Sequence, residues 1–506
     1  MSTFIAASTE IEMAPAGYTV RRGRQVIDGV FVVAAIAVLT LLITTAGSGI
    51  DEDLWWHLRT GDWIRAHGSV PRLDPFSSYS MGKPWIAYSW LFDLALSLLY
   101  SWGGLHAILA LTALIAASWP ALLTGLLSHW IPLRRAAILA SAAYLAICPL
   151  VSPRPWIFTI LFFLLELYCL YNARESDRPA WLIPIIPVFV LWANMHVQFV
   201  YGLAILTAFA LDHSLPEKLR LRLSAEPRPK LSAIYIWALL AVCALVTLLN
   251  PYGWRIYQVV QQYASQSTPL ILIQEMQSMQ FRCVSDWFVL SLVLCASFAI
   301  GYARRKNLLL ILLLVVSSIA GFRSARDRWF SAVVSVVAAA SSLPAVAKVE
   351  QRRFRRTLAL AIPTSLFLVC LIVANNKTWS ETAIRKRVAE RFPEQASSFV
   401  RTRNLPGPLF NTYDWGGFLI WDLPELPVSI DGRANLYGTY LLNAAVNMSG
   451  GNRWAKDRTF QKANTIILEQ NSALASILRV DQDYRLVYED KIAAIFQPVT
   501  SQLSQK

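Results

Sequence analysis

The chain is organised around Gly49-Ile50-Asp51-Glu52-Asp53-Leu54-Trp55-Trp56-His57-Leu58-Arg59-Thr60-Gly61-Asp62-Trp63-Ile64. This stretch begins where the first long apolar segment ends, so three consecutive carboxylates stand at the edge of a membrane. Carboxylates grouped at a lipid boundary repel one another and lose hydration, which favours a cation or a proton beside them. Residues 54–64 predict a helix that lies in the interface with its indole rings at headgroup depth.

The composition is typical of a polytopic membrane protein. Of the 506 residues, 55% are hydrophobic and 19 are tryptophan, and the mean hydropathy is +0.43. Charged residues gather in short clusters between apolar segments of roughly 17 to 25 residues, the length that crosses a bilayer as a helix. The net charge of +14 indicates no nucleic-acid partner, because the basic residues lie mainly in loops expected in the cytoplasm. The six cysteines show neither a disulfide framework nor a zinc spacing.

Basic residues also set the expected orientation. Three arginines within residues 1–25 precede the first span, 26–46, which predicts a cytoplasmic amino-terminal segment and an uncleaved anchor. An external loop over 47–86 follows, and prolines break it after the interfacial helix. The transmembrane domain, 26–375, continues with apolar segments at 87–102, 105–128, 136–150, 156–172, 180–195, 197–213, 232–249, 286–303, 307–322, 329–347 and 357–375.

Residues 87–127 create a conflict in this topology. They are long enough for two crossings, whereas Arg134 and Arg135, placed in the cytoplasm, allow one. Either one piece is interfacial or re-entrant, or the arginine pair lies outside against the usual bias. The later basic loops agree with a single crossing, which favours about 11 spans, with about 12 as the alternative.

Residues 376–506 differ from the rest in composition. Their charges nearly balance, residues 380–400 are typical of helix, and short apolar runs typical of strands occur at 419–421, 428–430, 465–468 and 493–496. About 130 residues suffice for one small domain. The predicted fold class is therefore an all-α polytopic membrane domain followed by a small extracytoplasmic α/β domain.

Asp51 and Asp53 are the candidate catalytic residues. Two carboxylates at i and i+2 can bind one divalent ion such as Mg²⁺ or Mn²⁺, or one can act as a base toward an acceptor hydroxyl while the other holds a cation. The alternative is that they only cap the helix that follows. His57 lies four residues after Asp53 on the same helical face, as a substrate contact or an interfacial polar contact.

Four arginines in loops predicted to be external are candidates for binding an anion: Arg154, Arg323, Arg326 and Arg328. Positive charge on the non-cytoplasmic side runs against the usual distribution and indicates anionic partners there. Guanidinium forks suit phosphate oxygens in a partly dry site. The alternatives are contact with lipid headgroups and pairing with Asp327 or Asp286.

Three further residues complete the candidate substrate-binding set. Asn194 and His196 end a span within Trp192-Ala193-Asn194-Met195-His196, and helix-end hydrogen bonds are the equal alternative. Asp74 lies in the predicted external loop, directly before a proline.

Two glycine-containing motifs mark the carboxy-terminal segment. Tyr413-Asp414-Trp415-Gly416-Gly417 permits a close backbone approach, and Asp431-Gly432 is a turn pair. A contact between Asp431 and Arg433 inside the domain is the default expectation. Contact of these motifs with a substrate or a partner is the alternative.

Taken together, these features resemble the GT-C superfamily of membrane glycosyltransferases. The resemblance rests on Asp51-x-Asp53 after the first span, the interfacial helix, the proline-broken loop and the many further spans. More narrowly, a bacterial group of GT-C-like membrane proteins is similar in the order of its motifs: Asp-Leu-Trp-Trp-His-Leu-x-Thr-Gly, Arg-Pro-Trp, Trp-x-Asn-x-His, Asn-Pro-Tyr-Gly, Asp-Trp-Gly-Gly and Asp-Gly-Arg. The resemblance spans most of the chain and is specific to the group rather than to a substrate.

The resemblance implies a glycosyltransferase of the bacterial inner membrane. Its donor would be a polyprenyl-phosphate-linked sugar, its acceptor a glycan, lipid or protein, and its site would face away from the cytoplasm. In characterised superfamily members an acidic residue of the first external loop is catalytic or binds a divalent metal, a role that falls by position on Asp51 or Asp53. The short carboxy-terminal segment and the absence of a WWD-type motif argue against glycosylation of peptide sequons.

Two other functions stay open at the level of the sequence. One is a non-catalytic transporter or assembly subunit for lipid-linked glycans, which should place charge at mid-bilayer, where Glu166 is the only acidic residue. The other is a ligase or polymerase that joins lipid-linked glycans, which would not need the acidic loop.

Overall fold

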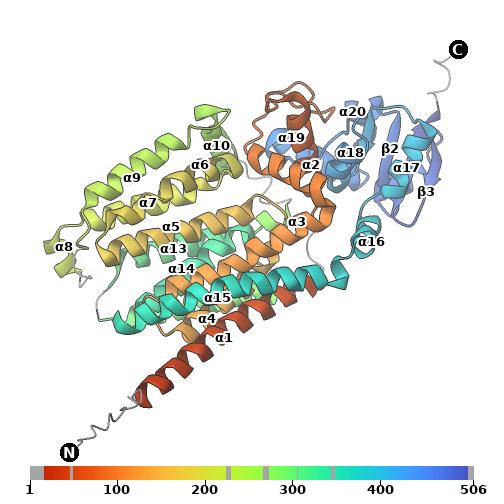
Figure 1. Cartoon of the computed structure of the whole chain (residues 1–506). Coiled ribbons are helices and arrows are strands. Elements are labelled where there is room, and N and C mark those ends of the chain that lie inside the picture. Colours follow the sequence, from red (N-terminus) through yellow and green to blue (C-terminus); the bar gives the residue numbers. More distant parts are fainter. Residues whose placement is uncertain are drawn as a thin grey trace, which may run out of the picture.

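Long helices make up most of the computed structural model, which describes residues 16–45, 50–223, 229–265, 273–304, 306–343 and 348–499. Figure 1 shows a bundle of helices with a carboxy-terminal domain at one end. The predicted amino-terminal segment lies outside the described residues up to residue 15, and Gly49, at the start of the acidic stretch, lies outside them too. The first helix, α1, spans Ala16–Thr45.

Every apolar segment that was expected to cross the membrane overlaps a helix. After α1 these are α3 (Trp90–Leu127), α4 (Leu133–Ile147), α5 (Trp156–Ser176), α6 (Ile185–Met195), α7 (Phe199–Ser214), α9 (Ala233–Val246), α12 (Val284–Tyr302), α13 (Leu308–Arg323), α14 (Arg328–Ser341) and α15 (Lys348–Asn375). By length and composition, four stretches of the described chain are long and apolar enough to span a membrane, and six shorter apolar helices accompany them. These helices support a multi-pass membrane protein, and the number of crossings stays a prediction.

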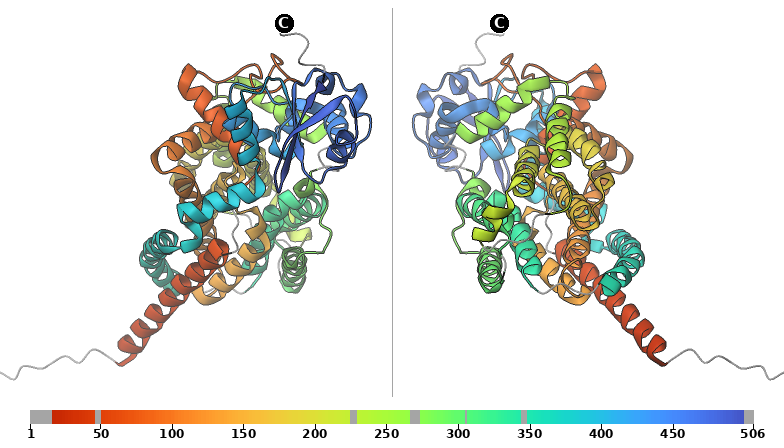
Figure 2. Two further views of the ribbon diagram at one scale, coloured as in Figure 1. Left: turned by 90° about the vertical axis from the view of Figure 1, so that its right-hand side faces the viewer. Right: turned by 90° about the vertical axis from the view of Figure 1, so that its left-hand side faces the viewer.

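Aromatic side chains fill the middle of this bundle. Phe163 of α5 packs against Trp329 of α14 with ring centroids 5.0 Å apart, and Tyr201 of α7 reaches the same indole at 5.5 Å. α1 and α15 lie side by side along one edge of the bundle (Figures 1 and 2). Two shorter helices, α8 (Glu217–Arg222) and α10 (Ile256–Ser265), lie at the ends of longer ones.

Gly103 and Gly104 divide α3 into two arms. Their backbone angles are not helical, and Gly104 has a φ of 60°, which glycine adopts without a steric penalty. The first arm packs against α2 (Leu54–His67). A Cβ on Gly61 of α2 would overlap the backbone carbonyl of Asp93, so the glycine allows the two helices to approach closely. Residues 90–127 are thus one broken helix with an arm bound to α2, which explains why the sequence suggested two crossings.

A four-stranded sheet forms the core of the carboxy-terminal domain. Its order is β1-β2-β4-β3, with β1 parallel to β2 and the other pairs antiparallel. The strands are β1 (Leu409–Asn411), β2 (Thr465–Glu469), β3 (Tyr484–Glu489) and β4 (Ala493–Pro498). The helices around it are α16 (Glu381–Arg391), α17 (Glu394–Arg403), α18 (Gly416–Asp422), α19 (Ala434–Ser449), α20 (Arg458–Lys462) and α21 (Ala473–Leu478).

Two of the apolar runs expected as strands have another structure. Residues 419–421 lie in α18. Residues 428–430 form a connection that pairs with the loop after α2: the Val428 carbonyl accepts from the Ser78 backbone N–H at 2.7 Å, and the Val428 N–H donates to the Phe76 carbonyl at 3.2 Å. Runs of three residues are too short for their alternation to distinguish these cases from strands.

The predicted place of Trp55 at the lipid interface is wrong, because the carboxy-terminal domain covers that face of α2. The Trp55 ring lies 5.3 Å from Phe392, 5.1 Å from Phe418 and 4.8 Å from Trp421, measured between centroids. Only 1% of Trp55 is exposed. The spacing of the aromatic residues correctly marked an apolar face of α2. It could not show whether lipid or the carboxy-terminal domain covers that face.

Candidate active site

Residues 50–53 carry the predicted catalytic acids to the junction between the helical bundle and the carboxy-terminal domain. Asp51 Oδ1 accepts a hydrogen bond from the Asp53 backbone N–H at 2.9 Å. Asp53 is the residue before α2, but its side chain makes no capping hydrogen bond. Helix capping therefore does not account for the Asp53 carboxylate.

Arg154 is the residue on which these acids converge. Its Nε donates to Asp51 Oδ1 at 2.6 Å, and its Nη1 lies 2.9 Å from Asp53 Oδ2. The same Nη1 donates to Glu275 Oε1 at 2.6 Å, from the short helical turn η4 (Gln274–Met276). The Arg154 side chain is only 10% exposed, so these ion pairs are weakly screened by water.

Arg326 joins the same cluster from the turn η5 (Ala325–Asp327). Its guanidinium pairs with Glu275, and it lies 5.1 Å from the Trp156 ring centroid, while Arg154 lies 4.7 Å from the same ring. Two positive charges share this space because Glu275 bridges them and the indole face attracts both. Two of the four predicted anion-binding arginines thus meet.

The acids of this cluster differ in their protonation. Burial raises the pKa of Asp53 to about 7, against the lowering effect of Arg154. Burial also acts on Glu275, but Arg326 and Arg154 together hold the pKa of its carboxyl below the ordinary value. Asp53 is therefore poised to exchange a proton near neutral pH, while Glu275 stays ionised as a counter-ion.

The carboxy-terminal domain supplies one wall of this site. A Cβ on Gly432 would overlap the Asp53 carboxylate, so this turn of the domain approaches the acid as closely as a backbone can. Burial raises the pKa of Tyr413, and the charge of Asp53 adds to the increase. Arg391 of α16 pairs with Glu52.

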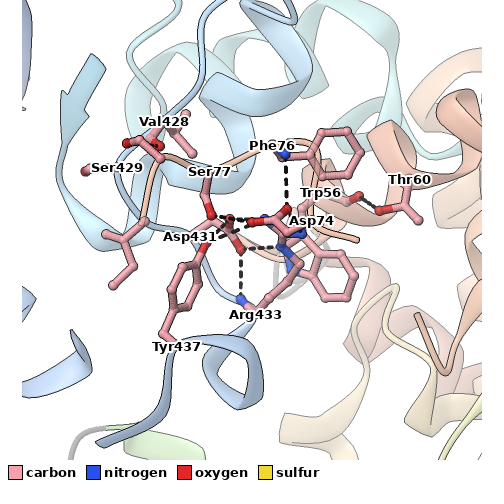
Figure 3. A network of polar contacts seen from close by, with 12 residues as sticks. Trp56, Thr60, Asp74, Phe76, Ser77, Val428, Ser429, Asp431, Arg433 and Tyr437 are labelled. Carbon is pink, nitrogen blue, oxygen red and sulfur yellow. Dashed lines mark hydrogen bonds and ion pairs between the residues drawn. The ribbon is translucent and has the colours of Figure 1, made fainter. Parts of the chain in front are cut away.

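A buried network fastens this wall to the loop after α2 (Figure 3). Arg433 places Nη2 2.6 Å from Asp431 Oδ2 and Nη1 2.8 Å from Asp74 Oδ1, and Tyr437 donates to Asp431. The expected contact between Asp431 and Arg433 is confirmed. Asp74 also accepts from the Ser77 hydroxyl at 2.5 Å and is buried, so these contacts give it a structural task, and its substrate-binding role stays a prediction.

The imidazole of His57 pairs with Asp93 and not with Asp53, which shares its helical face. Its Nδ1 lies 2.5 Å from Asp93 Oδ1 on the first arm of α3, and both side chains are buried. Burial lowers the pKa of His57, so the imidazole is neutral at pH 7. This contact ties α2 to α3, and a contact of His57 with substrate stays a prediction.

Asn194 and His196 are engaged by neighbouring helices. Asn194 Oδ1 accepts from Trp90 Nε1 at 2.8 Å, and its amide donates to the Leu249 carbonyl at 2.9 Å. His196 Nδ1 lies 2.8 Å from the Thr159 hydroxyl. These contacts match the helix-end alternative, and substrate binding by either residue stays a prediction.

The other two arginines of the predicted set lie apart from Arg154 and Arg326. Arg323 is exposed at the end of α13. Arg328 is buried and pairs with Asp286 at 3.1 Å, the alternative considered from the sequence, and it donates to the Ser285 hydroxyl at 2.8 Å.

Sequence reasoning missed Glu275. It bonds Arg154 and Arg326 across 121 and 51 residues of chain, so no local spacing marks it. The only available signal is a single carboxylate in the loop between α10 and α12, which also carries other polar residues.

The residues at the site do not fit a divalent cation as they stand. Among the described residues, no group of three or more histidine, cysteine, aspartate or glutamate side chains is placed to hold a metal ion. Asp51 and Asp53, the predicted metal ligands, both contact the Arg154 guanidinium, which supplies the positive charge between them. Mg²⁺ demands a near-octahedral set of about six oxygen ligands, and a fixed cation within the set opposes it.

No protein-family model and no curated protein matches the chain. Among solved structures, an Archaeoglobus fulgidus oligosaccharyltransferase tethered to an acceptor peptide is 12% identical with a TM-score of 0.48, over 86% of this chain and 69% of that one. ArnT from Cupriavidus metallidurans, bound to undecaprenyl phosphate, is 12% identical with a TM-score of 0.46, over 96% and 99%. The same oligosaccharyltransferase was also crystallised with zinc and sulfate.

At this identity and these TM-scores, the likeness assigns no donor, acceptor or catalytic residue to this chain.

Proposed function

We propose that this chain transfers a glycosyl group from a polyprenyl-phosphate-linked donor to an acceptor hydroxyl on the extracytoplasmic face of the membrane. One observation carries the proposal. A carboxyl group with a pKa near 7 and two arginines meet at one largely buried point between an apolar helical bundle and a polar domain. Lateral access from the membrane suits a lipid-linked donor at such a junction.

Asp53 is the base in the proposed reaction. It takes the proton of the acceptor hydroxyl while the acceptor oxygen bonds to the anomeric carbon and the bond from that carbon to the donor phosphate oxygen breaks. A base with a pKa close to the working pH is ionised and still strong enough to accept the proton. The sugar leaves the lipid phosphate and joins the acceptor.

The two arginines receive the negative charge that the leaving phosphate gains. Arg326 and Arg154 are held beside Trp156, and stabilisation by such fixed charges in a dry site is strong. The Glu275 carboxylate bridges both guanidinium groups. In the proposed reaction the donor phosphate would take the place of this carboxylate, so one anion replaces another. Asp51 keeps Arg154 in place by accepting a hydrogen bond from the Arg154 Nε.

The test replaces each acid by its amide. Asp53→Asn keeps the size and any capping ability, so it should leave the protein folded and inserted while transfer falls by at least about 100-fold. The measurement is glycan product formed in membranes at matched protein levels. Asp62→Asn, on the same helix, is the control and should retain transfer. Full transfer by Asp53→Asn and by the double variant with Asp51→Asn would refute the proposed role of the acids.

The pH profile gives a second readout of the same proposal. Since the base must lose its proton before the reaction, transfer should rise with pH through about 7 and level off above it. Asp327 is the control, because burial raises its pKa to about 6. Asp327→Asn should keep the rise near 7. If the rise disappears in Asp327→Asn instead, the titrating group is Asp327 and not Asp53.

A second candidate function, a non-catalytic transporter or assembly subunit for lipid-linked glycans, has one observation in its favour. Glu166 is buried in α5, and neither of its carboxyl oxygens has a hydrogen-bond partner among the described residues. Acids buried in spans often belong to transport paths. Loss of glycan export in Glu166→Gln, together with unchanged export in Asp53→Asn, would favour this function over transfer.

A further inference from the structure

A cavity of about 180 Å³ lies between the loop after α2, α10 and α19. Its polar lining includes two guanidinium groups and three carboxamides, from Arg72, Arg255, Gln258, Gln262 and Asn435. None of the residues that line it carries a carboxylate. The cluster of Asp53, Arg154 and Arg326 lies outside this lining, so the cavity is a separate site.

The two arginines of this cavity keep most of their hydrogen-bonding capacity. Arg72 donates one hydrogen bond, to the Pro251 carbonyl at 3.2 Å, and within the described part of the chain neither Arg72 nor Arg255 has an ion-pair partner. Both are exposed at the cavity. Two positive charges without a carboxylate beside them favour an anionic ligand.

Aromatic residues give the cavity a rigid side. The buried Arg433 lies 4.5 Å from the Trp85 ring centroid, which links this wall to the network in Figure 3. Tyr252 donates to the Pro71 carbonyl at 2.8 Å and accepts from the Ala87 N–H at 3.1 Å. Carboxamides beside a fixed aromatic surface suit a ring that carries several hydroxyl groups.

The cavity and the candidate active site both involve residues of α10. Gln262 lines the cavity, and the next residue, Tyr263, has its hydroxyl 3.1 Å from that of Tyr88. Tyr263 lies within electrostatic range of Asp53 and Arg326. One residue of α10 thus lines the positively charged cavity while the next lies within electrostatic range of the proposed base.

We propose that this cavity binds a negatively charged sugar unit of a glycan acceptor and so selects acidic glycans as substrates. The inference rests on the proposed function, because it places the acceptor chain beside Asp53. The donor phosphate is assigned to Arg154 and Arg326, which leaves this cavity to the acceptor. The three carboxamides match sugar hydroxyls, and α10 is not among the apolar helices, so a glycan fits the lining better than a lipid headgroup does.

The test is binding of a soluble probe to the full-length protein in phosphatidylcholine nanodiscs. The probe is a trisaccharide of galacturonate, and its neutral methyl ester is the control ligand. The acidic trisaccharide should bind, more weakly as the salt concentration rises, and the ester should not. The double variant Arg72→Gln/Arg255→Gln should bind at least about tenfold more weakly, since hydrogen bonds to charged groups are lost. Arg403→Gln/Arg485→Gln removes two exposed arginines elsewhere in the carboxy-terminal domain and should bind normally.

Three results would overturn the proposal. They are no binding of the acidic trisaccharide to the natural protein, equal binding by the double variant, and displacement of the trisaccharide when the nanodiscs also contain phosphatidylglycerol. The last result would assign the cavity to a lipid headgroup. Asp53→Asn should bind the trisaccharide normally, so a failure of the proposed transfer reaction and a failure of this cavity to bind acidic sugar can be told apart.

Discussion

At the scale of single residues, the four predicted arginines provide a matched comparison. Arg326 contacts Glu275 and Trp156 at the candidate site, whereas Arg323 is exposed at the end of α13. Arg326→Gln should raise the KM for the lipid-linked donor at least about tenfold, because a charged contact to phosphate is lost. Arg323→Gln should leave this KM unchanged.

The measurement is initial transfer rate against donor concentration in detergent-solubilised protein, with the folded fraction checked by gel filtration. Arg154 is a poorer test, because its removal leaves three carboxylates without their common partner. An equal effect of the two substitutions would mean that the arginines act through general charge rather than at one site.

Residue-level reasoning from the sequence identified both sides of the candidate ion cluster but not its connections. Asp51 and Asp53 were marked by spacing at a membrane edge, and Arg154 and Arg326 by positive charge in two loops predicted to be external. Glu275 could not be found, since its importance depends on partners far away in the chain. His57 has the right spacing to face Asp53, but Asp93 from α3 competes for the imidazole.

At the scale of elements, the turn at Gly432 determines where the Asp53 carboxylate lies. A methyl group there would overlap the carboxylate and turn it away from Arg154. Gly432→Ala should therefore reduce transfer by at least about tenfold while the buried contacts of Arg433 persist. Gly301→Ala is the control, because a Cβ on Gly301 meets no atom within 4 Å. Glycan product at equal protein level measures both, and full transfer by Gly432→Ala would show that Asp53 needs no such exact placement.

Elements were predictable where their signal is long and were mistaken where it is short. Every apolar segment of the membrane domain overlaps a helix, since a run of about 15 to 20 apolar residues has few other solutions. The strands β2 and β4 were also marked by their apolar runs. Residues 419–421 gave the same signal, yet they are helical because the surrounding tertiary structure determines the outcome for so short a run.

At the scale of the whole molecule, the orientation in the membrane is the prediction that most needs a measurement. We expect the carboxy-terminal domain outside the cytoplasm and α8 inside it. In a variant without the six natural cysteines, Val480→Cys should react with a membrane-impermeant maleimide in intact cells, and Leu221→Cys only after permeabilisation. Both positions are well exposed, at 83% and 71%. The reverse pattern would invert the topology and place the candidate site in the cytoplasm.

The ion pair between Asp74 and Arg433 joins residues that are 359 positions apart. A ribosome makes the chain from its amino terminus, so the acids at 51 and 53 exist long before Arg433, Gly432 and the strands that support them. During synthesis the wall of the candidate site is therefore missing at first, and it forms only after the carboxy-terminal domain has been made. Chains that terminate early would carry the acids but no completed site, so an unfinished product of translation would be unable to carry out the proposed transfer.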